Sequence, residues 1–304
     1  MIRRKLTLSA WQPALANRNF DRVAAATALE ALPQADAILQ HDGAMTSVVV
    51  REVGSGTKPT VFQVLALHDE ADRPNMWEFG QPAKSITLPS GTYTAFITHV
   101  VLWPGYVAGH DMWASAPGLG RLSLFISQRT DERVMFRPLF DPSLRERLDD
   151  LRGWRGVDIA IHDPEKRQAA KRLGLLGSLL SSRVPTFHIT MGMGRKGPRD
   201  AYLDPDVADQ LLGEIDRAEE LFDGLIIRGH SKTEKTKAGN PKLIEINLLT
   251  ERLHEVANLT ADTSATNLPD AVETVEELTR VRRKMDNDGR LGKALEARIG
   301  PGTG

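Results

Sequence analysis

The stretch "GLIIRGHSKTEKTKAGNPKLIEINLL", residues 224–249, places a charged segment between two apolar runs. Apolar, β-branched runs of this length are typical of strands, so the sequence predicts a β-hairpin here. The segment from Arg228 to Lys242 contains five Lys or Arg residues and one acid, Glu234. Such a tip is either a solvated turn or a surface that binds a polyanion. The function of the protein depends on which of the two it is.

Strand-like segments also fill the first half of the chain. Runs rich in Val, Thr and aromatic residues predict strands at 5–11, 47–53, 59–69 and 92–103. The stretch 120–140 predicts a further strand, a charged turn and a second strand. A helix is predicted over 20–32, where the apolar spacing is helical and Pro33 follows.

The second half has more helical spacing. A helix is predicted over 142–152, with Pro142 in its first turn, and another over 163–182, with Asp163 as its N-cap. A third helix is predicted over 204–222. The last runs from Pro269 to Ile299, and Gly289 and Gly292 break it near its end. A strand is predicted over 185–193. These elements predict an α+β fold with mixed or antiparallel sheets packed by helices. We expect a β-rich N-terminal domain, 1–162, and a C-terminal α/β domain, 163–304, with discontinuous domains as an open alternative.

The composition limits the classes of function. The formal net charge of −1 gives no global attraction to nucleic acid or membrane, so any basic function must be local. The sequence has no Cys, which excludes disulfides, thiolate nucleophiles and cysteine metal sites. The N-terminal stretch "MIRRKLTLSAWQPAL" is a poor match to a signal peptide, and no apolar run is long enough to span a bilayer. We therefore expect a soluble, cytoplasmic protein.

Two motifs suggest catalysis only weakly. "GMGRKG", with Gly192, Gly194 and Gly197, fits the pattern of a dinucleotide-binding loop, but Pro198 follows where that site needs a helix, so a basic loop is favoured. The adjacent pairs His110–Asp111 and His162–Asp163 are typical of metal phosphohydrolases. No further histidines or carboxylates with helical spacing accompany them. We expect neither a metal nor a cofactor.

A Mg²⁺-dependent nuclease or toxin is the main enzymatic alternative. Asp223 ends a predicted helix, and "LIEIN" places Glu245 and Asn247 on one face of a strand. Nucleases of the restriction type use Asp, Glu and Lys in this arrangement to hold Mg²⁺ and activate water. Asn247 stands where Lys would supply the positive charge, so a structural pair on an exposed strand explains the same residues.

Basic residues form three clusters in the second half of the chain. They are Lys166, Arg167, Lys171 and Arg172 on a predicted helix, Arg195, Lys196 and Arg199 in the glycine loop, and Arg228, Lys232, Lys235, Lys237 and Lys242 in the hairpin. A few Lys or Arg contacts to phosphates support sequence-independent DNA binding through counterion release. Few aromatic residues accompany them, which favours the backbone of a duplex over base stacking on single strands. A protein-interaction module whose hairpin binds an acidic partner is a further alternative.

The order of these features resembles the RexA family of temperate-phage exclusion proteins. The stretches that carry the resemblance are "GTYTAFITHVVLWPGYVAGHDM" (91–112), "RLSLFISQRTDERVMFRPLF" (121–140), "LRGWRGVDIAI" (151–161) and "EELFDGLIIRGHSKTEKTK" (219–237), followed by the charged C-terminal helix. The resemblance covers most of the chain in order and rests on no catalytic motif.

The resemblance implies a two-domain homodimer that binds double-stranded DNA without sequence preference and has no enzymatic activity. It implies a fold similar to that of RdgC, a protein that encircles DNA, and a reorientation of the domains when DNA enters. It places DNA contacts at Arg228, Lys232, Lys235 and Lys237. It also implies a membrane protein of the RexB kind as a partner.

Overall fold

The chain divides into two compact units, and each is discontinuous in the sequence. A computed structural model describes residues 1–14, 19–41, 43–68, 75–76, 84–85, 92–112, 117–161, 187–192, 202–204, 224–262 and 268–296. The first unit comprises Met1–Phe136 and His254–Lys284, and the second comprises Arg137–Leu253 and Met285–Gly304. The architecture is α+β with antiparallel strands in two main sheets, which confirms the fold class at this level.

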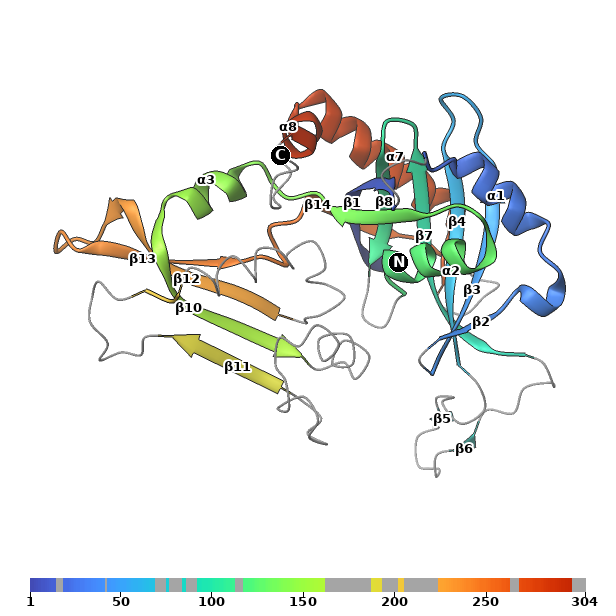
Figure 1. The fold of residues 1–304 in the computed structure, drawn as a ribbon, viewed down its shortest axis with the longest axis horizontal. Coiled ribbons are helices and arrows are strands. Elements are labelled where there is room, and N and C mark those ends of the chain that lie inside the picture. The colour runs from blue at the N-terminus through green and yellow to red at the C-terminus, as the bar shows by residue number, and fades with distance from the viewer. Residues whose placement is uncertain are drawn as a thin grey trace. The chain divides into compact units, whose positions relative to one another are not determined.

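The described part of the first unit is built on an eight-stranded sheet that curls into a half-barrel (Figure 1). Along the sheet the order is β14-β1-β8-β7-β4-β3-β2, and β9 also pairs with β1. The strands are β1 (Ile2–Pro13), β2 (Leu39–His41), β3 (Ala44–Glu52), β4 (Thr60–His68), β7 (Thr94–Trp103), β8 (Val107–Met112), β9 (Val134–Pro138) and β14 (His254–Leu259). The four strands predicted from the first hundred residues are confirmed as β1, β3, β4 and β7.

Short elements complete this unit. A 3-10 turn, η1, spans Gln34–Asp36. Two small ribbons consist of β5 (Asn75–Met76) with β6 (Lys84–Ser85), and of β15 (Ala261–Asp262) with β16 (Leu268–Pro269).

Helices α1 (Arg22–Glu30) and α2 (Leu119–Arg129) pack on one face of the sheet. The predicted helix over 20–32 is confirmed as α1, whose first turn is capped because Asp21 accepts a hydrogen bond from the amide of Val23 at 2.8 Å. The prediction of a strand at the start of 120–140 is wrong. Alternating Leu122, Leu124 and Ile126 are typical of a strand, but the buried face of α2 consists of residues 119, 122, 125 and 126, which have helical spacing.

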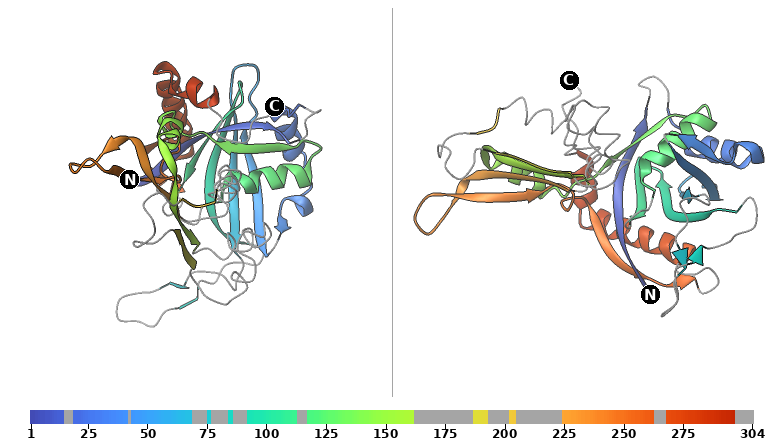
Figure 2. Two further views of the ribbon diagram at one scale, coloured as in Figure 1. Left: turned by 60° about the vertical axis from the view of Figure 1, so that its left-hand side comes forward. Right: turned by 90° about the horizontal axis from the view of Figure 1, so that it is seen from below.

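Helix α7 (Ala271–Asn287) lies against the opposite face of the same sheet (Figure 2). A Cβ atom on Gly109 of β8 would lie 2.7 Å from the Trp103 ring and 3.2 Å from Leu278 of α7, so strand and helix approach each other closely there. Gly289 has a φ of +72° and separates α7 from α8 (Arg290–Glu296). The predicted break near the end of the C-terminal helix is confirmed at this glycine.

The second unit is built, in its described part, on a four-stranded antiparallel sheet with the order β11-β10-β12-β13. The strands are β10 (Leu151–Ile161), β11 (Phe187–Gly192), β12 (Gly224–Lys235) and β13 (Pro241–Asn247). One face carries the core, with apolar residues from β10, β12 and β13. Helix α3 (Ser143–Asp149) contributes the buried Leu144 to this core.

The two units differ from the predicted domains, 1–162 and 163–304. Strand β10 belongs to the second unit because it pairs with β11 and β12, and β14 belongs to the first because it pairs with β1. Pairing between strands so distant in sequence leaves no local signal. The predicted strand at 185–193 is confirmed as β11, whereas the helices predicted over 163–182 and 204–222 lie, apart from Asp204, outside the described residues. No helix in the described ranges is long and apolar enough to cross a membrane.

Candidate nucleic-acid interface

The stretch 224–249 contains the hairpin that the sequence predicts. Strands β12 and β13 pair in antiparallel register, with Arg228 opposite Glu245 and Lys235 opposite Pro241. The turn closes where the Thr236 amide donates to the Asn240 carbonyl at 2.7 Å. Gly239 lies within it at a φ of +78°, a conformation that favours glycine.

The outer half of this hairpin extends beyond the sheet. Pairing of β12 with β10 ends at Ser231, opposite Leu151, and among the described residues the remainder of β12 pairs only with β13. Figure 1 shows the two strands continuing past the end of β10 to a loop. Residues 232–240 are all exposed. We call residues 231–242 the outer ribbon.

Two lysines at the end of the outer ribbon are available to a ligand. The side chains of Lys235 and Lys237 are exposed, and neither has a hydrogen bond or ion pair with any residue that the structure describes. Within the described part of the chain, nothing neutralises the positive charge of either side chain. A two-stranded ribbon is also narrow enough to enter the major groove of a DNA duplex, which is about 12 Å wide.

The other two lysines of the ribbon have partners within the protein. The Lys242 ammonium lies 2.6 Å from a carboxylate oxygen of Glu234, and both side chains are about half exposed, at 54% and 52%. The Lys232 ammonium donates to the backbone carbonyl of Asp149. Exposed ion pairs contribute only about 0–1 kcal/mol, but a phosphate must still displace the partner oxygen before it contacts either lysine.

Arg228 is held far more firmly. Its guanidinium lies 2.5 Å from Asp158 of β10 and 2.8 Å from Glu245 of β13. The hydrogen bond with Glu245, followed by that with Asp158, raises the pKa of Arg228 against the opposing effect of desolvation. Because two carboxylates surround one cation, Arg228 adds no net positive charge to the hairpin, and its geometry is that of a cross-strand structural link.

The described part of the structure does not bring together the residues of the nuclease alternative. Glu245 is the ion-pair partner of Arg228, and Asp223 lies outside the described residues. Asn247 accepts a hydrogen bond from the amide of Leu249 at 3.1 Å, so it stabilises the turn that follows β13. Across the ranges that the structure covers, no group of three or more His, Asp or Glu residues is placed to hold a metal ion.

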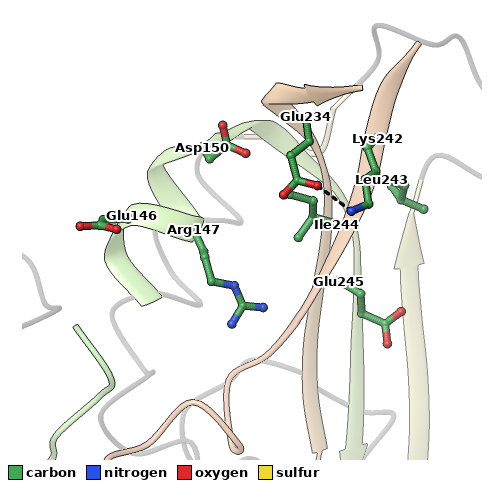
Figure 3. A pocket seen from close by; sticks show the side chains of 8 residues that line it. All are labelled: Glu146, Arg147, Asp150, Glu234, Lys242, Leu243, Ile244 and Glu245. Atoms are coloured by element: carbon green, nitrogen blue, oxygen red, sulfur yellow. Dashed lines mark hydrogen bonds and ion pairs between the residues drawn. The ribbon is translucent and has the colours of Figure 1, made fainter. Parts of the chain in front are cut away.

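A shallow hollow of about 420 Å³ lies beside the ribbon, between α3 and β13 (Figure 3). Its lining includes four carboxylates and two cations, together with Leu243 and Ile244: Glu146, Asp150, Glu234, Glu245, Arg147 and Lys242. Arg147 is further paired with Glu251. The hollow is therefore acidic, and within the hairpin the positive charges without a described partner lie at the end of the ribbon.

The remaining predicted DNA contacts fall outside the described residues. They are Lys166, Arg167, Lys171, Arg172, Arg195, Lys196 and Arg199. Of the glycine motif, Gly192 is the last residue of β11, and Gly194 and Gly197 are likewise outside. The hairpin is the one basic cluster of the three whose geometry the structure describes.

The His110–Asp111 pair of the metal interpretation is buried in the first unit. Asp111 accepts a hydrogen bond from the amide of His99 at 2.5 Å and lies 3.9 Å from the guanidinium of Arg4. Burial lowers the pKa of Arg4, and the charge of Asp111 opposes this effect. Asp111 thus has a structural role as the counter-ion of a buried arginine, a pairing that the sequence does not reveal. His162 and Asp163 lie outside the described residues.

Comparison with known proteins gives no family for this chain. No protein-family model matches the sequence, and no curated protein matches it.

Proposed function

We propose that this protein binds double-stranded DNA without sequence preference, through the end of the β12–β13 hairpin. The observation that carries the proposal is the pair Lys235 and Lys237, exposed at the end of a ribbon that extends beyond its sheet and without a partner among the described residues. Lysine contacts phosphates as a point charge, and such contacts position a protein on DNA without reading its sequence.

The composition of the ribbon supports duplex DNA as the ligand. Residues 231–242 contain no aromatic side chain on which a nucleobase could stack, and proteins that bind single strands combine such stacking with a positively charged groove. The acidic hollow beside the ribbon limits the contact to its end. A contact of two lysines is weak, and a homodimer with two hairpins would raise the overall affinity by avidity.

The ordered resemblance of the sequence to RexA-like exclusion proteins supports a biological setting for this activity. In that setting the chain acts in a temperate-phage exclusion system, without an enzymatic step, as a homodimer with an RdgC-like domain arrangement that changes when DNA enters. A membrane protein of the RexB kind would be its partner.

Salt-titrated fluorescence anisotropy on several unrelated duplexes tests the proposal. Each phosphate contact adds about −0.9 to the slope of log K against log salt, so two lysines predict a slope of about −1.8 for one hairpin. We expect equal affinities for all the duplexes at low salt. Absence of binding at low salt, a strong preference for one sequence, or Mg²⁺-dependent cutting that Glu245→Ala abolishes would contradict the proposal.

A further inference from the structure

The outer ribbon needs support from outside the sheet. Two strands alone are marginally stable in water, and the register between β12 and β13 is irregular between His230 and Lys235. A ribbon that moved freely would lose conformational freedom on binding DNA, which would weaken the complex. Contacts between β12 and the described residues beside it therefore affect how well Lys235 and Lys237 are positioned.

A single residue, Asp150, holds three consecutive residues of the ribbon. Asp150 is the C-cap of α3, and its backbone carbonyl accepts a hydrogen bond from the amide of Lys232 at 2.7 Å. One carboxylate oxygen accepts from the hydroxyl of Ser231. The other accepts from both the amide and the hydroxyl of Thr233, at 3.1 and 2.9 Å.

These contacts extend along the ribbon through Ser231. The Ser231 side chain is completely buried, and its hydroxyl oxygen also accepts from the amide of Glu234 at 2.6 Å. The chain of hydrogen bonds thus runs from α3 through Asp150 and Ser231 to the residue immediately before Lys235. The hydroxyl of Ser231, and then the groups of Thr233, lower the pKa of Asp150, so the carboxylate is ionised throughout the neutral range.

The sign of this charge is unfavourable for the proposed ligand. A carboxylate beside a DNA-binding ribbon repels phosphate, and electrostatics alone would favour its loss. Figure 3 shows Asp150 at the end of α3, beside the ribbon. The repulsion between this carboxylate and the phosphates weakens DNA binding. That loss is offset if the carboxylate holds the ribbon in the orientation that binds DNA, because less conformational freedom is then lost on binding.

We infer that Asp150 is a positioning residue of the DNA interface, which acts by anchoring the outer ribbon to α3 and does not touch DNA itself. This inference rests on the proposed function. It gives α3 a role at the interface, because the position of Lys235 and Lys237 relative to the sheet is fixed through the last turn of that helix. It also makes an unusual prediction, since removing a negative charge should weaken the binding of a polyanion.

The experiment compares two charge-matched variants. Asp150→Ala removes the anchor and one negative charge, while Glu146→Gln removes a negative charge one turn earlier in α3, from a side chain with no hydrogen bond or ion pair to any described residue. Anchoring predicts that Asp150→Ala weakens duplex binding roughly 5- to 10-fold with an unchanged salt slope, because the lysines remain but the ribbon must be ordered. Glu146→Gln should bind as tightly as the wild type or slightly more tightly.

A second pair of variants leaves the charge unchanged. Thr233→Val has the same shape but loses the hydroxyl bond to Asp150, and Thr233→Ser keeps that hydroxyl. We expect weaker binding for Thr233→Val and near wild-type binding for Thr233→Ser. Amide hydrogen exchange of residues 232–237 should accelerate in Asp150→Ala and Thr233→Val, while the amides of β10 keep their protection.

The results separate the anchor from the DNA-binding activity. Tighter binding by Asp150→Ala, equal to that of Glu146→Gln, would overturn the inference, and so would unchanged exchange in the ribbon. If the wild-type protein failed to bind any duplex, the proposed function would fall and the role at DNA with it. Accelerated exchange in Asp150→Ala would then show that Asp150 orders the ribbon without any role at DNA.

Discussion

The ammonium group of Lys242 lies 2.6 Å from a carboxylate oxygen of Glu234, on the opposite strand of the β12–β13 hairpin. This pair divides the basic residues of the hairpin into two classes. Lys235 and Lys237 have no partner among the described residues, whereas Lys242, Lys232 and Arg228 are each bonded to oxygen atoms of the protein. A count of Lys and Arg in the sequence therefore overstates the charge that DNA would meet.

The first prediction concerns Glu234. Glu234→Gln should tighten duplex binding and make the salt slope steeper by about 0.9, because Lys242 is then released to contact a phosphate. Glu276→Gln is the matched control, because this substitution removes the same charge from an exposed side chain on α7, in the first unit. Salt-titrated anisotropy measures both. If Glu234→Gln gives the affinity and slope of the control, Lys242 lies too far from DNA to take part.

The second prediction concerns Arg228, which we expect to contribute to stability more than to DNA binding. Arg228→Gln leaves the carboxylates of Asp158 and Glu245 without their cation, and the Asp158 side chain is only 10% exposed. We expect a loss of about 1–2 kcal/mol in the free energy of unfolding. Urea denaturation measures this loss, and the salt slope of DNA binding should stay within error of the wild type. A slope shallower by one phosphate contact would instead place Arg228 on DNA.

The third prediction is the pH dependence of the anchor. Hydrogen bonds lower the pKa of Asp150 below its ordinary value of 3.8, so its stabilising effect is complete above that value and is lost as the pH falls through the lowered pKa. Exchange of the amides of Thr233 and Glu234, corrected for the intrinsic rate, should be constant from neutral pH to about 5 and accelerate only below 3.8. Acceleration already between pH 6 and 5 would assign the protection to another group.

The hairpin was predictable because its signals are local. Short apolar runs mark β12 and β13, and the polar segment between them marks the turn. The strands of the first unit were predictable for the same reason. Helix α2 was missed because Leu122, Leu124 and Ile126 alternate as in a strand, and only the packing against the sheet shows that the helical face is the buried one.

The pairing of side chains could not be read from the sequence. Asp158 and Arg228 are 70 residues apart in number, and they meet because β10 and β12 are neighbours in the sheet. The same holds for Asp150 and Ser231, and for the burial of Arg4 beside Asp111. These contacts show which Lys and Arg side chains are already paired among the described residues. Only the three-dimensional arrangement therefore narrows the candidate DNA contacts of the hairpin to Lys235 and Lys237.

The most direct test of the central claim is the salt dependence of duplex binding by Lys235→Ala/Lys237→Ala. The control is Lys58→Ala/Lys293→Ala, which removes two exposed lysines outside the hairpin whose side chains have no partner among the described residues. The account predicts that the first variant loses about 1.8 units of slope per hairpin and binds all duplexes equally weakly, while the control keeps the wild-type slope. Equal slopes and affinities for the wild type and Lys235→Ala/Lys237→Ala would contradict the account.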